Sequence, residues 1–470
     1  MSDFKRSLKS SSGRMAAGVL GQIINTFGQV AVVPLFLLFW TKRSYGEWLV
    51  LTAVPNLLWS LEGGLGLLAL NQMVLCTAVG DWKGANRVFQ NIFVIQMLIS
   101  AVMVAGGFLF AKFVNFLPFM GLTEISRHDA GFILVVMLLY MSFGWGIALL
   151  RAPYFASENS TRGTMLTNFW RLSDFLVISL VLLLHGKAQW VAVGETIVAA
   201  VWVVLACLDI RRVCPDFKFY LSDVSWQSCK SACRDGIPLF LLQAGSALFI
   251  QGYPLVLSRT LGTLAVVNFT AIRTVTRVLL QGIQTLTQAA SVEFTSSLAK
   301  KKWELYLRWV KILSFCVAGS SICACIGLFY FGPDIIALWT HGKVVVAGPL
   351  LLLFGISVSL QAAWTLFGTL LYTANKHHLQ CYVYFAATIV ALLVARLTIG
   401  HLGFGAVPVI MICTDVFVLI TSISLCVHYL RDVKFVSLFL LFNPFFYWNK
   451  IKWVVTKTKG EGFYFWSPNR

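Results

Sequence analysis

Long apolar stretches constrain this chain more than any other feature of its sequence. Each stretch has roughly 20 or more residues, which as a helix is enough to cross a hydrocarbon core about 30 Å thick. Only 12% of the 470 residues are charged, whereas a soluble domain has about 25%. The stretches predict about twelve membrane-spanning helices, at about 15–40, 46–76, 88–115, 129–152, 164–184, 189–209, 237–258, 262–297, 309–332, 347–372, 379–399 and 402–428.

A polar break divides these spans into two sets of six. We predict an all-α polytopic membrane protein in which two pseudo-symmetric six-helix bundles, residues 1–210 and 237–430, flank a cytoplasmic linker at 211–236. The last segment, 431–470, is basic and aromatic, and its apolar run is too short to span a bilayer comfortably. It therefore predicts an interfacial segment on the cytoplasmic leaflet.

The two halves also resemble each other weakly in sequence. The segment from Pro34 to Gly46 can be aligned by eye with the segment from Pro254 to Gly262. Both begin the first hairpin of a half and have the same orientation. The alignment indicates a parallel repeat.

The net charge of +18 is distributed unevenly among the connecting loops. If the N-terminus is inside, Lys and Arg outside the spans divide between inner and outer loops at roughly four to one, as the positive-inside rule requires. The sequence thus predicts that both termini are cytoplasmic, and it gives no reason to expect nucleic acid as a partner. The first span follows a basic segment directly and lacks a small-residue cleavage site, so we interpret it as a spanning helix and not as a signal peptide.

The eighth predicted span, NFTAIRTVTRVLLQGIQTLTQ, carries the strongest functional signal. It places Arg277, Gln281 and Gln284 on one helix face, with Arg273 beside them. Hydrogen bonds between helices would account for the glutamines. Two arginines one turn apart repel each other and need water or an anion, so we predict that this face borders a solvated cationic cavity.

Other spans carry polar side chains that could line the same cavity. They are Gln22, Asn25 and Gln29 in the first span, Arg171 and Asp174 in the fifth, Gln361 in the tenth and Arg396 in the eleventh. Arg171 and Asp174 are three residues apart on a helix and could instead neutralise each other. Arg396 lies near a helix end, where it could extend to the interface or pair with Asp415.

Glu62 lies in the otherwise apolar second span, where an unpaired carboxylate costs about 3 kcal/mol. The repeat alignment places it opposite position 278, one residue from Arg277, so the two halves would present opposite charges at a similar depth. Two roles remain open for Glu62. It could be a counter-charge to the arginines or a protonatable coupling residue, a role that Asp174 could also fill.

The arrangement of loops and spans favours a transporter over other classes. A membrane glycosyltransferase or polymerase would be expected to carry a large outer loop and paired acidic residues, but every predicted outer loop here is short. A channel usually repeats a pore element, and none is visible. Cys229 and Cys233 have no His or further Cys at metal-ligand spacing, so we expect no metal or other cofactor.

The chain resembles the polysaccharide-transporter branch of the multidrug/oligosaccharidyl-lipid/polysaccharide (MOP) superfamily, the Wzx-type O-antigen flippases, over about residues 14–430. The resemblance rests on the basic N-terminus that runs into the first span, a YGEWLVL turn and the acidic-glycine motif Glu62-Gly63-Gly64-Leu65. It also rests on the arginine-bearing eighth span followed by a basic loop. The family more often has Asp before this glycine.

The resemblance implies a flippase of the bacterial inner membrane. Its substrate would be undecaprenyl-pyrophosphate-linked oligosaccharide repeat units, such as O-antigen, moved from the cytoplasmic to the periplasmic leaflet by alternating access through a cationic central cavity. Implied partners are this lipid-linked oligosaccharide, membrane lipids, a polysaccharide polymerase and a chain-length regulator.

Two related classes differ from this chain. The multidrug and toxin extruders (MATE proteins) are a sister branch that binds organic cations with carboxylates in the first and seventh spans, and both spans here lack an acid. A MATE-like drug or ion antiporter, and less directly a membrane-embedded glycosyl-transfer enzyme, remain the alternatives. Lipid II flippases also have a cationic cavity, but they usually add two further spans.

Overall fold

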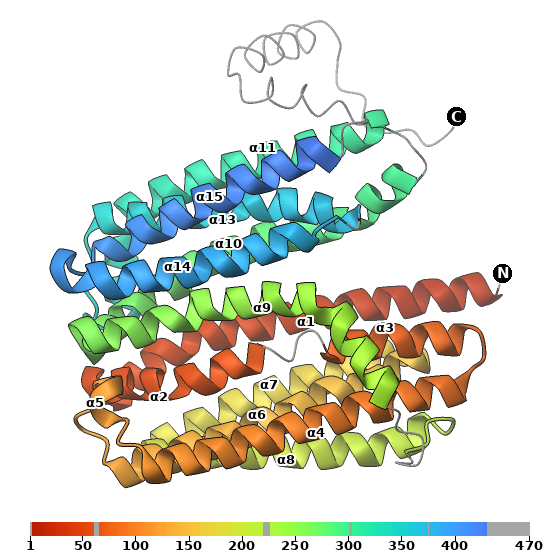
Figure 1. Cartoon of the computed structure of the whole chain (residues 1–470), viewed down its shortest axis with the longest axis horizontal. Coiled ribbons are helices and arrows are strands. Elements are labelled where there is room, and N and C mark those ends of the chain that lie inside the picture. Colours follow the sequence, from red (N-terminus) through yellow and green to blue (C-terminus); the bar gives the residue numbers. More distant parts are fainter. Residues whose placement is uncertain (1, 61–64, 220–225, 300–302, 375, 430–470) are drawn as a thin grey trace, which may run out of the picture.

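The computed structural model describes residues 2–60, 65–219, 226–299, 303–374 and 376–429. Glu62, with its neighbours Gly63 and Gly64, lies outside the described residues, as does the expected interfacial segment 431–470. Figure 1 shows long helices that run side by side in two groups, with the N-terminal helices below and most of the C-terminal helices above.

All regular secondary structure within these ranges is helical. The helices are α1 (Ser2–Phe39), α2 (Lys42–Ser60), α3 (Leu65–Ala78), α4 (Trp82–Phe113), α5 (Leu117–Met120), α6 (Arg127–Ala156), α7 (Ser160–Leu183), α8 (Ala188–Val213), α9 (Trp226–Leu261), α10 (Thr263–Ala299), α11 (Trp303–Tyr330), α12 (Gly332–Trp339), α13 (Gly348–Thr373), α14 (His378–Leu402) and α15 (Ala406–Tyr429). Within the described ranges, eleven helices are long and apolar enough to cross a membrane. The predicted all-α, multi-pass membrane fold is thus confirmed.

The second span, expected at 46–76, contains most of α2, with Pro55 inside it, and most of α3, and residues 61–64 between them lie outside the described residues. The predicted spans differ from the observed helices at the start of each half. The first helix of each half begins well before its expected span, α1 at Ser2 and α9 at Trp226. The expected linker at 211–236 is therefore partly helical.

The helices of the two halves pack in the same pattern. α1 packs against α7 as α9 packs against α14, and α6 packs against α8 as α13 packs against α15. The contacts of α4 with α6 likewise correspond to those of α11 with α13. Each half also has a short helix, α5 or α12, after its third span. Such corresponding contacts are what a parallel internal repeat produces.

The two halves meet along α2, α9 and α10. Gly46 lies against the start of α10, because a Cβ at this position would be 2.5 Å from the carbonyl oxygen of Thr263. The largest buried apolar cluster crosses this seam, with Phe36 stacked on Tyr45 at 5.1 Å on one side and Tyr253 packed near Phe269 on the other. Around these four aromatic residues, the contact between the halves is therefore a packed apolar core and not a solvated gap.

Further contacts join the halves at the end of the molecule where α1 ends. They are hydrogen bonds from Ser258 Oγ to the Met120 carbonyl, from Arg259 Nη1 to the Pro118 carbonyl, from Trp339 Nε1 to the Val30 carbonyl and from Lys343 Nζ to the Leu37 carbonyl. We call these four contacts the outer clasp. Through them, the short helix region of each half is tied to the first helix of the other half.

Candidate functional site

A cavity of about 440 Å³ lies among the helices of the second half. Its polar lining comes from α9, α10 and α13, and consists of Gln243, Ser246, Arg273, Thr276, Arg277, Gln284, Thr287, Gln361, Thr365 and Thr369. All of its lining residues belong to the second half. This cavity therefore does not lie between the two halves, where the sequence predicts a central cavity.

The two arginines lie at the depth where a charge is most costly in a bilayer. At 1.5 Å per residue, Arg273 and Arg277 lie about 15 Å and 21 Å along α10 from its start at the outer clasp, about halfway across the hydrocarbon core. An arginine at this depth costs about 3 kcal/mol or more unless it is solvated or paired. Neither of the ion pairs found within the described ranges involves Arg273 or Arg277.

Arg273 and Arg277 have different surroundings. Arg273 donates a 2.6 Å hydrogen bond from Nη1 to the carbonyl of Ile250, and its guanidinium lies 5.7 Å from the centre of the Phe269 ring. For Arg277, no hydrogen bond is formed to any residue that the structure describes. Arg277 is therefore the better placed of the two to bind an anion in the cavity, with Arg273 held beside it.

The polar stripe of α10 is turned relative to the one that the sequence predicts. The residues that line the cavity recur at Arg273, Thr276, Leu280, Gln284 and Thr287, together with Arg277. Gln281 instead faces the first half: its Nε2 donates to Gln29 Oε1 at 3.0 Å, and its Oε1 accepts from Thr26 Oγ1 at 3.2 Å. The glutamines thus divide between the cavity and the contact of α10 with α1.

Two aromatic side chains, which we call the aromatic wall, also line the cavity. Trp364 on α13 and Tyr384 on α14 both line the space, with their ring centres 4.9 Å apart. Trp364 donates from Nε1 to Asp415 Oδ1 at 3.0 Å, and Ser357 donates to Asp415 Oδ2 at 2.6 Å. The buried Asp415 is bonded to these two neutral groups and not to Arg396, so the suggested Arg396–Asp415 pair is not formed.

The other predicted residues lie away from the cavity. Gln22 is exposed and Asn25 half-buried on α1, while Arg396 is exposed on α14, as expected if its side chain extends to the interface. Arg171 is exposed on α7 and forms no ion pair with Asp174 within the described ranges, so mutual neutralisation of these two residues is not observed. Gln361 lines the cavity as predicted, although its functional role stays a prediction.

A separate acidic cluster lies inside the first half. Asp174 Oδ2 accepts a 2.7 Å hydrogen bond from the Tyr140 hydroxyl. Asp174 Oδ1 and Glu195 Oε2 are buried without a hydrogen-bond partner among the residues described. The Tyr140 ring stacks on the Trp59 ring with 5.6 Å between the ring centres, so the cluster lies next to aromatic side chains. Neither acid forms an ion pair within the described ranges, which marks this cluster as a second place where a proton or cation could be held.

Sequence analysis missed three residues of these sites. Trp364 and Tyr384 read as ordinary apolar positions, because nothing in the sequence shows which aromatic side chains border a cavity. Glu195 does carry a sequence signal, because it is a lone carboxylate in the span predicted at 189–209, as Glu62 is in the second span.

Comparison with known proteins finds matches in structure only. No protein-family model and no curated protein sequence matches the chain. An inward-facing multidrug resistance MATE family transporter of the MOP superfamily aligns with a TM-score of 0.74 and 12% identity, over 90% of this chain and 98% of that chain. An outward-facing transporter of the same description aligns with a TM-score of 0.64 and 13% identity, over 91% of this chain and 96% of that chain.

A flippase shares the same fold. The lipid II flippase MurJ in an inward closed conformation aligns with a TM-score of 0.66 and 11% identity, over 91% of this chain and 92% of that chain. At these identities the likeness defines the fold, which is that of MOP-superfamily transporters.

Proposed function

We propose that the chain is a flippase for lipid-linked oligosaccharides with an anionic headgroup, in which the second-half cavity binds the headgroup. The substrate that best fits is undecaprenyl pyrophosphate carrying a repeat unit of O-antigen or a related surface polysaccharide. It would be moved from the cytoplasmic to the periplasmic leaflet of a bacterial inner membrane, with both termini of the chain cytoplasmic. The protein catalyses no covalent step in this proposal.

The observation that carries the proposal is a pair of arginines, unpaired with any described carboxylate, in a mid-membrane cavity. A guanidinium presents a planar fork of donors that suits phosphate and carboxylate oxygens. Gln284, Gln361 and Thr365 add donors and acceptors for sugar hydroxyls. The volume of about 440 Å³ is within the range of ordinary small-ligand sites and suits part of an oligosaccharide headgroup.

The aromatic wall supports a glycan as the cargo. The hydrogen bond to Asp415 fixes the plane of the Trp364 ring, and this ring lines the same cavity as the arginines on α10. A sugar ring has an apolar face that can pack on an indole while its hydroxyls and any acidic group reach polar side chains. The polyprenyl tail would stay in lipid while the headgroup crosses.

Deletion of the gene in its native bacterium tests the proposal. We expect loss of the surface polysaccharide and accumulation of lipid-linked repeat units on the cytoplasmic leaflet, and both defects should be restored by the intact gene. Normal surface polysaccharide in a deletion strain without a second flippase would contradict the proposal. A polysaccharide polymerase and a chain-length regulator are its expected functional partners.

The acidic cluster supports a second candidate function, export of organic cations. Asp174 and Glu195 are the buried carboxylates that a cationic drug would need, and the fold is shared with multidrug transporters. Efflux of a fluorescent cation from vesicles, lost in Asp174→Asn, would support this function. No efflux in vesicles that do flip lipid-linked oligosaccharide would leave the cluster with a coupling role.

A further inference from the structure

A groove between two helices of the first half, away from the cavity, has no role in the proposed flippase. It has a volume of about 570 Å³ and lies between α7 and α8, at the end where α7 begins and α8 ends. Its mouth is lined by Arg162, Asp209 and Arg212, and its body by Phe169, Trp202 and Leu205. The charged mouth is at a membrane surface, because it coincides with the helix ends.

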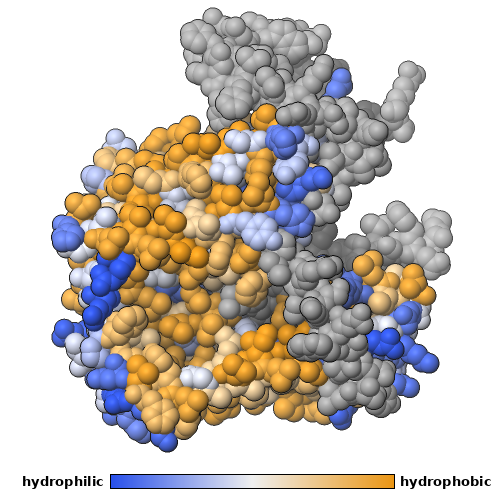
Figure 2. All heavy atoms as spheres, in the orientation of Figure 1, coloured by the Kyte–Doolittle hydropathy of each residue, from blue (hydrophilic) through white to orange (hydrophobic). Residues whose placement is uncertain are grey.

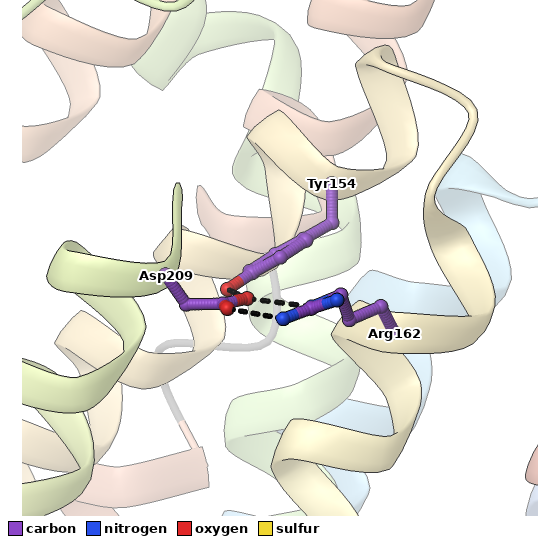
Figure 3. Close-up of polar contacts among 3 residues, drawn as sticks. All are labelled: Tyr154, Arg162 and Asp209. Atoms are coloured by element: carbon purple, nitrogen blue, oxygen red, sulfur yellow. Dashed lines mark hydrogen bonds and ion pairs between the residues drawn. The ribbon is translucent and has the colours of Figure 1, made fainter. Parts of the chain in front are cut away.

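The mouth is built around one carboxylate that accepts three hydrogen bonds. Asp209 accepts two hydrogen bonds from Arg162, at 2.8 Å from Nε and 2.5 Å from Nη2, and a third from the Tyr154 hydroxyl at 2.7 Å. Figure 3 shows the carboxylate of Asp209 between these two side chains. The two-point contact fixes Arg162 and cancels its charge.

Arg212 gives the mouth a net positive charge. It lies in the last turn of α8, three residues after Asp209, and forms no ion pair within the part of the chain that the structure describes. Asp209 Oδ2 accepts from Arg162 and Tyr154, and Oδ1 accepts from Arg162. Arg212 is exposed, so its guanidinium is available to an anion.

The body of the groove is apolar and reaches into the membrane. From Arg162 to Phe169, and from Asp209 back to Trp202, the helices run about two turns, or about 10 Å, into the hydrocarbon region. The Phe169 and Trp202 rings are nearly parallel, with an angle of 5° between their planes and 6.4 Å between their centres. The Phe169 side chain is exposed. A cation at the surface above an apolar channel matches an amphiphile with an anionic head and a hydrocarbon chain.

We propose that this groove is a binding site for an anionic phospholipid, with the lipid phosphate on Arg212 and one acyl chain along Phe169, Trp202 and Leu205. The charge asymmetry of the loops places it in the cytoplasmic leaflet, which is rich in anionic lipid. The proposal does not depend on the transported substrate, because the groove and the cavity lie in different halves of the molecule.

Quenching of Trp202 by brominated lipids tests the site. Purified full-length protein is placed in nanodiscs that contain phosphatidylglycerol and phosphatidylcholine in equal amounts, with bromine on the acyl chains of one lipid at a time. The chain has 16 Trp, so the signal of Trp202 is taken as the difference from Trp202→Phe. We expect brominated phosphatidylglycerol to occupy the groove about fivefold more than brominated phosphatidylcholine.

Arg211 provides the matched control. It is exposed in the same last turn of α8 but does not line the groove. Arg212→Gln should abolish the preference for phosphatidylglycerol, and Arg211→Gln should keep it. Equal quenching by both lipids would show ordinary boundary lipid and overturn the proposal, as would equal losses in the two variants. Loss of the preference on addition of inorganic phosphate alone would assign the site to a soluble anion and also overturn it.

Discussion

Arg273 and Arg277 illustrate how two neighbouring arginines can have different tasks. Arg273 is held by the Ile250 carbonyl and the Phe269 ring, whereas Arg277 has no hydrogen bond to a described residue. A guanidinium in this position is stable in a membrane only with water or a bound anion. The cavity therefore presents its charge mainly through Arg277, with Arg273 as a fixed neighbour.

Substitution of Arg277 tests this division. A hydrogen bond to a charged group contributes about 1.5–3 kcal/mol, so Arg277→Ala should lower the rate of headgroup flipping about tenfold or more. Arg277→Lys should have an intermediate rate, since it keeps the charge and loses the planar fork. Arg396→Ala removes an exposed arginine outside the cavity and should leave the rate unchanged. Equal rates for both alanine variants, at equal protein levels, would show that Arg277 does not bind the substrate.

Asp415 is a second residue whose environment makes a clear prediction. Two donors, Ser357 and Trp364, bond to its two oxygens. An amide in its place offers only one acceptor oxygen, so Asp415→Asn should lower the stability by about 1–3 kcal/mol. The thermal unfolding of the purified protein measures this loss. Ser424→Ala is the control, because Ser424 is exposed on the same helix and bonds only to its own backbone at Ile420; a similar shift in both variants would argue against the Asp415 contacts.

At the scale of whole helices, the sequence predicts well which helices form and in what order. It predicts less well which face of a helix borders the cavity. The apolar stretches locate eleven of the spans. The stripe on α10 was placed about one residue out of phase, because this helix contacts α1, α9, α11 and α13 and carries polar groups on more than one face. Hydrophobic periodicity cannot distinguish a cavity from a polar contact between helices.

The location of the cavity could not be predicted for a related reason. Charge and spacing on α10 predict a solvated cavity beside it, but the other residues that line this cavity come mainly from α9, α13 and α14. Trp364 and Tyr384 carry no sequence signal that separates them from the many other aromatic residues. The apolar seam between α2, α9 and α10 is likewise a property of packing between distant segments.

The contact between α2 and α10 gives a prediction at this scale. A Cβ on residue 46 would approach the Thr263 carbonyl oxygen to 2.5 Å, so Gly46→Ala must push the two helices apart. Such overpacking costs about 1–3 kcal/mol, and it should lower the thermal unfolding temperature. Gly18→Ala on α1 meets nothing within 4 Å and should leave the temperature unchanged. An unchanged temperature for Gly46→Ala would mean that the halves are not in close contact there.

On the scale of the whole molecule, the exposed surface and the inter-half contacts describe a bundle of apolar helices whose halves are tied together where α1 ends. Apolar side chains cover much of the visible surface of the helix bundle (Figure 2). The outer clasp ties the halves at the end where α1 finishes, while α1 and α10 meet further in through Gln29 and Gln281. Alternating access would require the clasp to part so that the headgroup can leave on that side.

A covalent link across the clasp tests this motion. In a background without native cysteines, cysteines at positions 118 and 259 joined by a short cleavable linker should stop flipping, because the Arg259–Pro118 contact between the halves can no longer open. Cleavage of the linker should restore the rate. Thr41 and Glu124 lie at the same end but both within the first half, with Thr41 Oγ1 3.4 Å from Glu124 Oε2. Cysteines at these two positions should have no effect on flipping when they are linked. Full activity with the 118–259 pair linked would exclude opening at the clasp.

The central claim is that the cationic cavity carries an anionic, lipid-linked glycan across the membrane. The most direct measurement uses purified protein in liposomes with undecaprenyl-pyrophosphate-linked oligosaccharide and a glycan-modifying enzyme that cannot cross the bilayer. We predict that the intact protein exposes the inner-leaflet glycan to this enzyme over time, and that the Arg273→Ala, Arg277→Ala double variant, with an unchanged unfolding temperature, does not. Equal exposure by the two proteins, or none by the intact protein, would contradict the account.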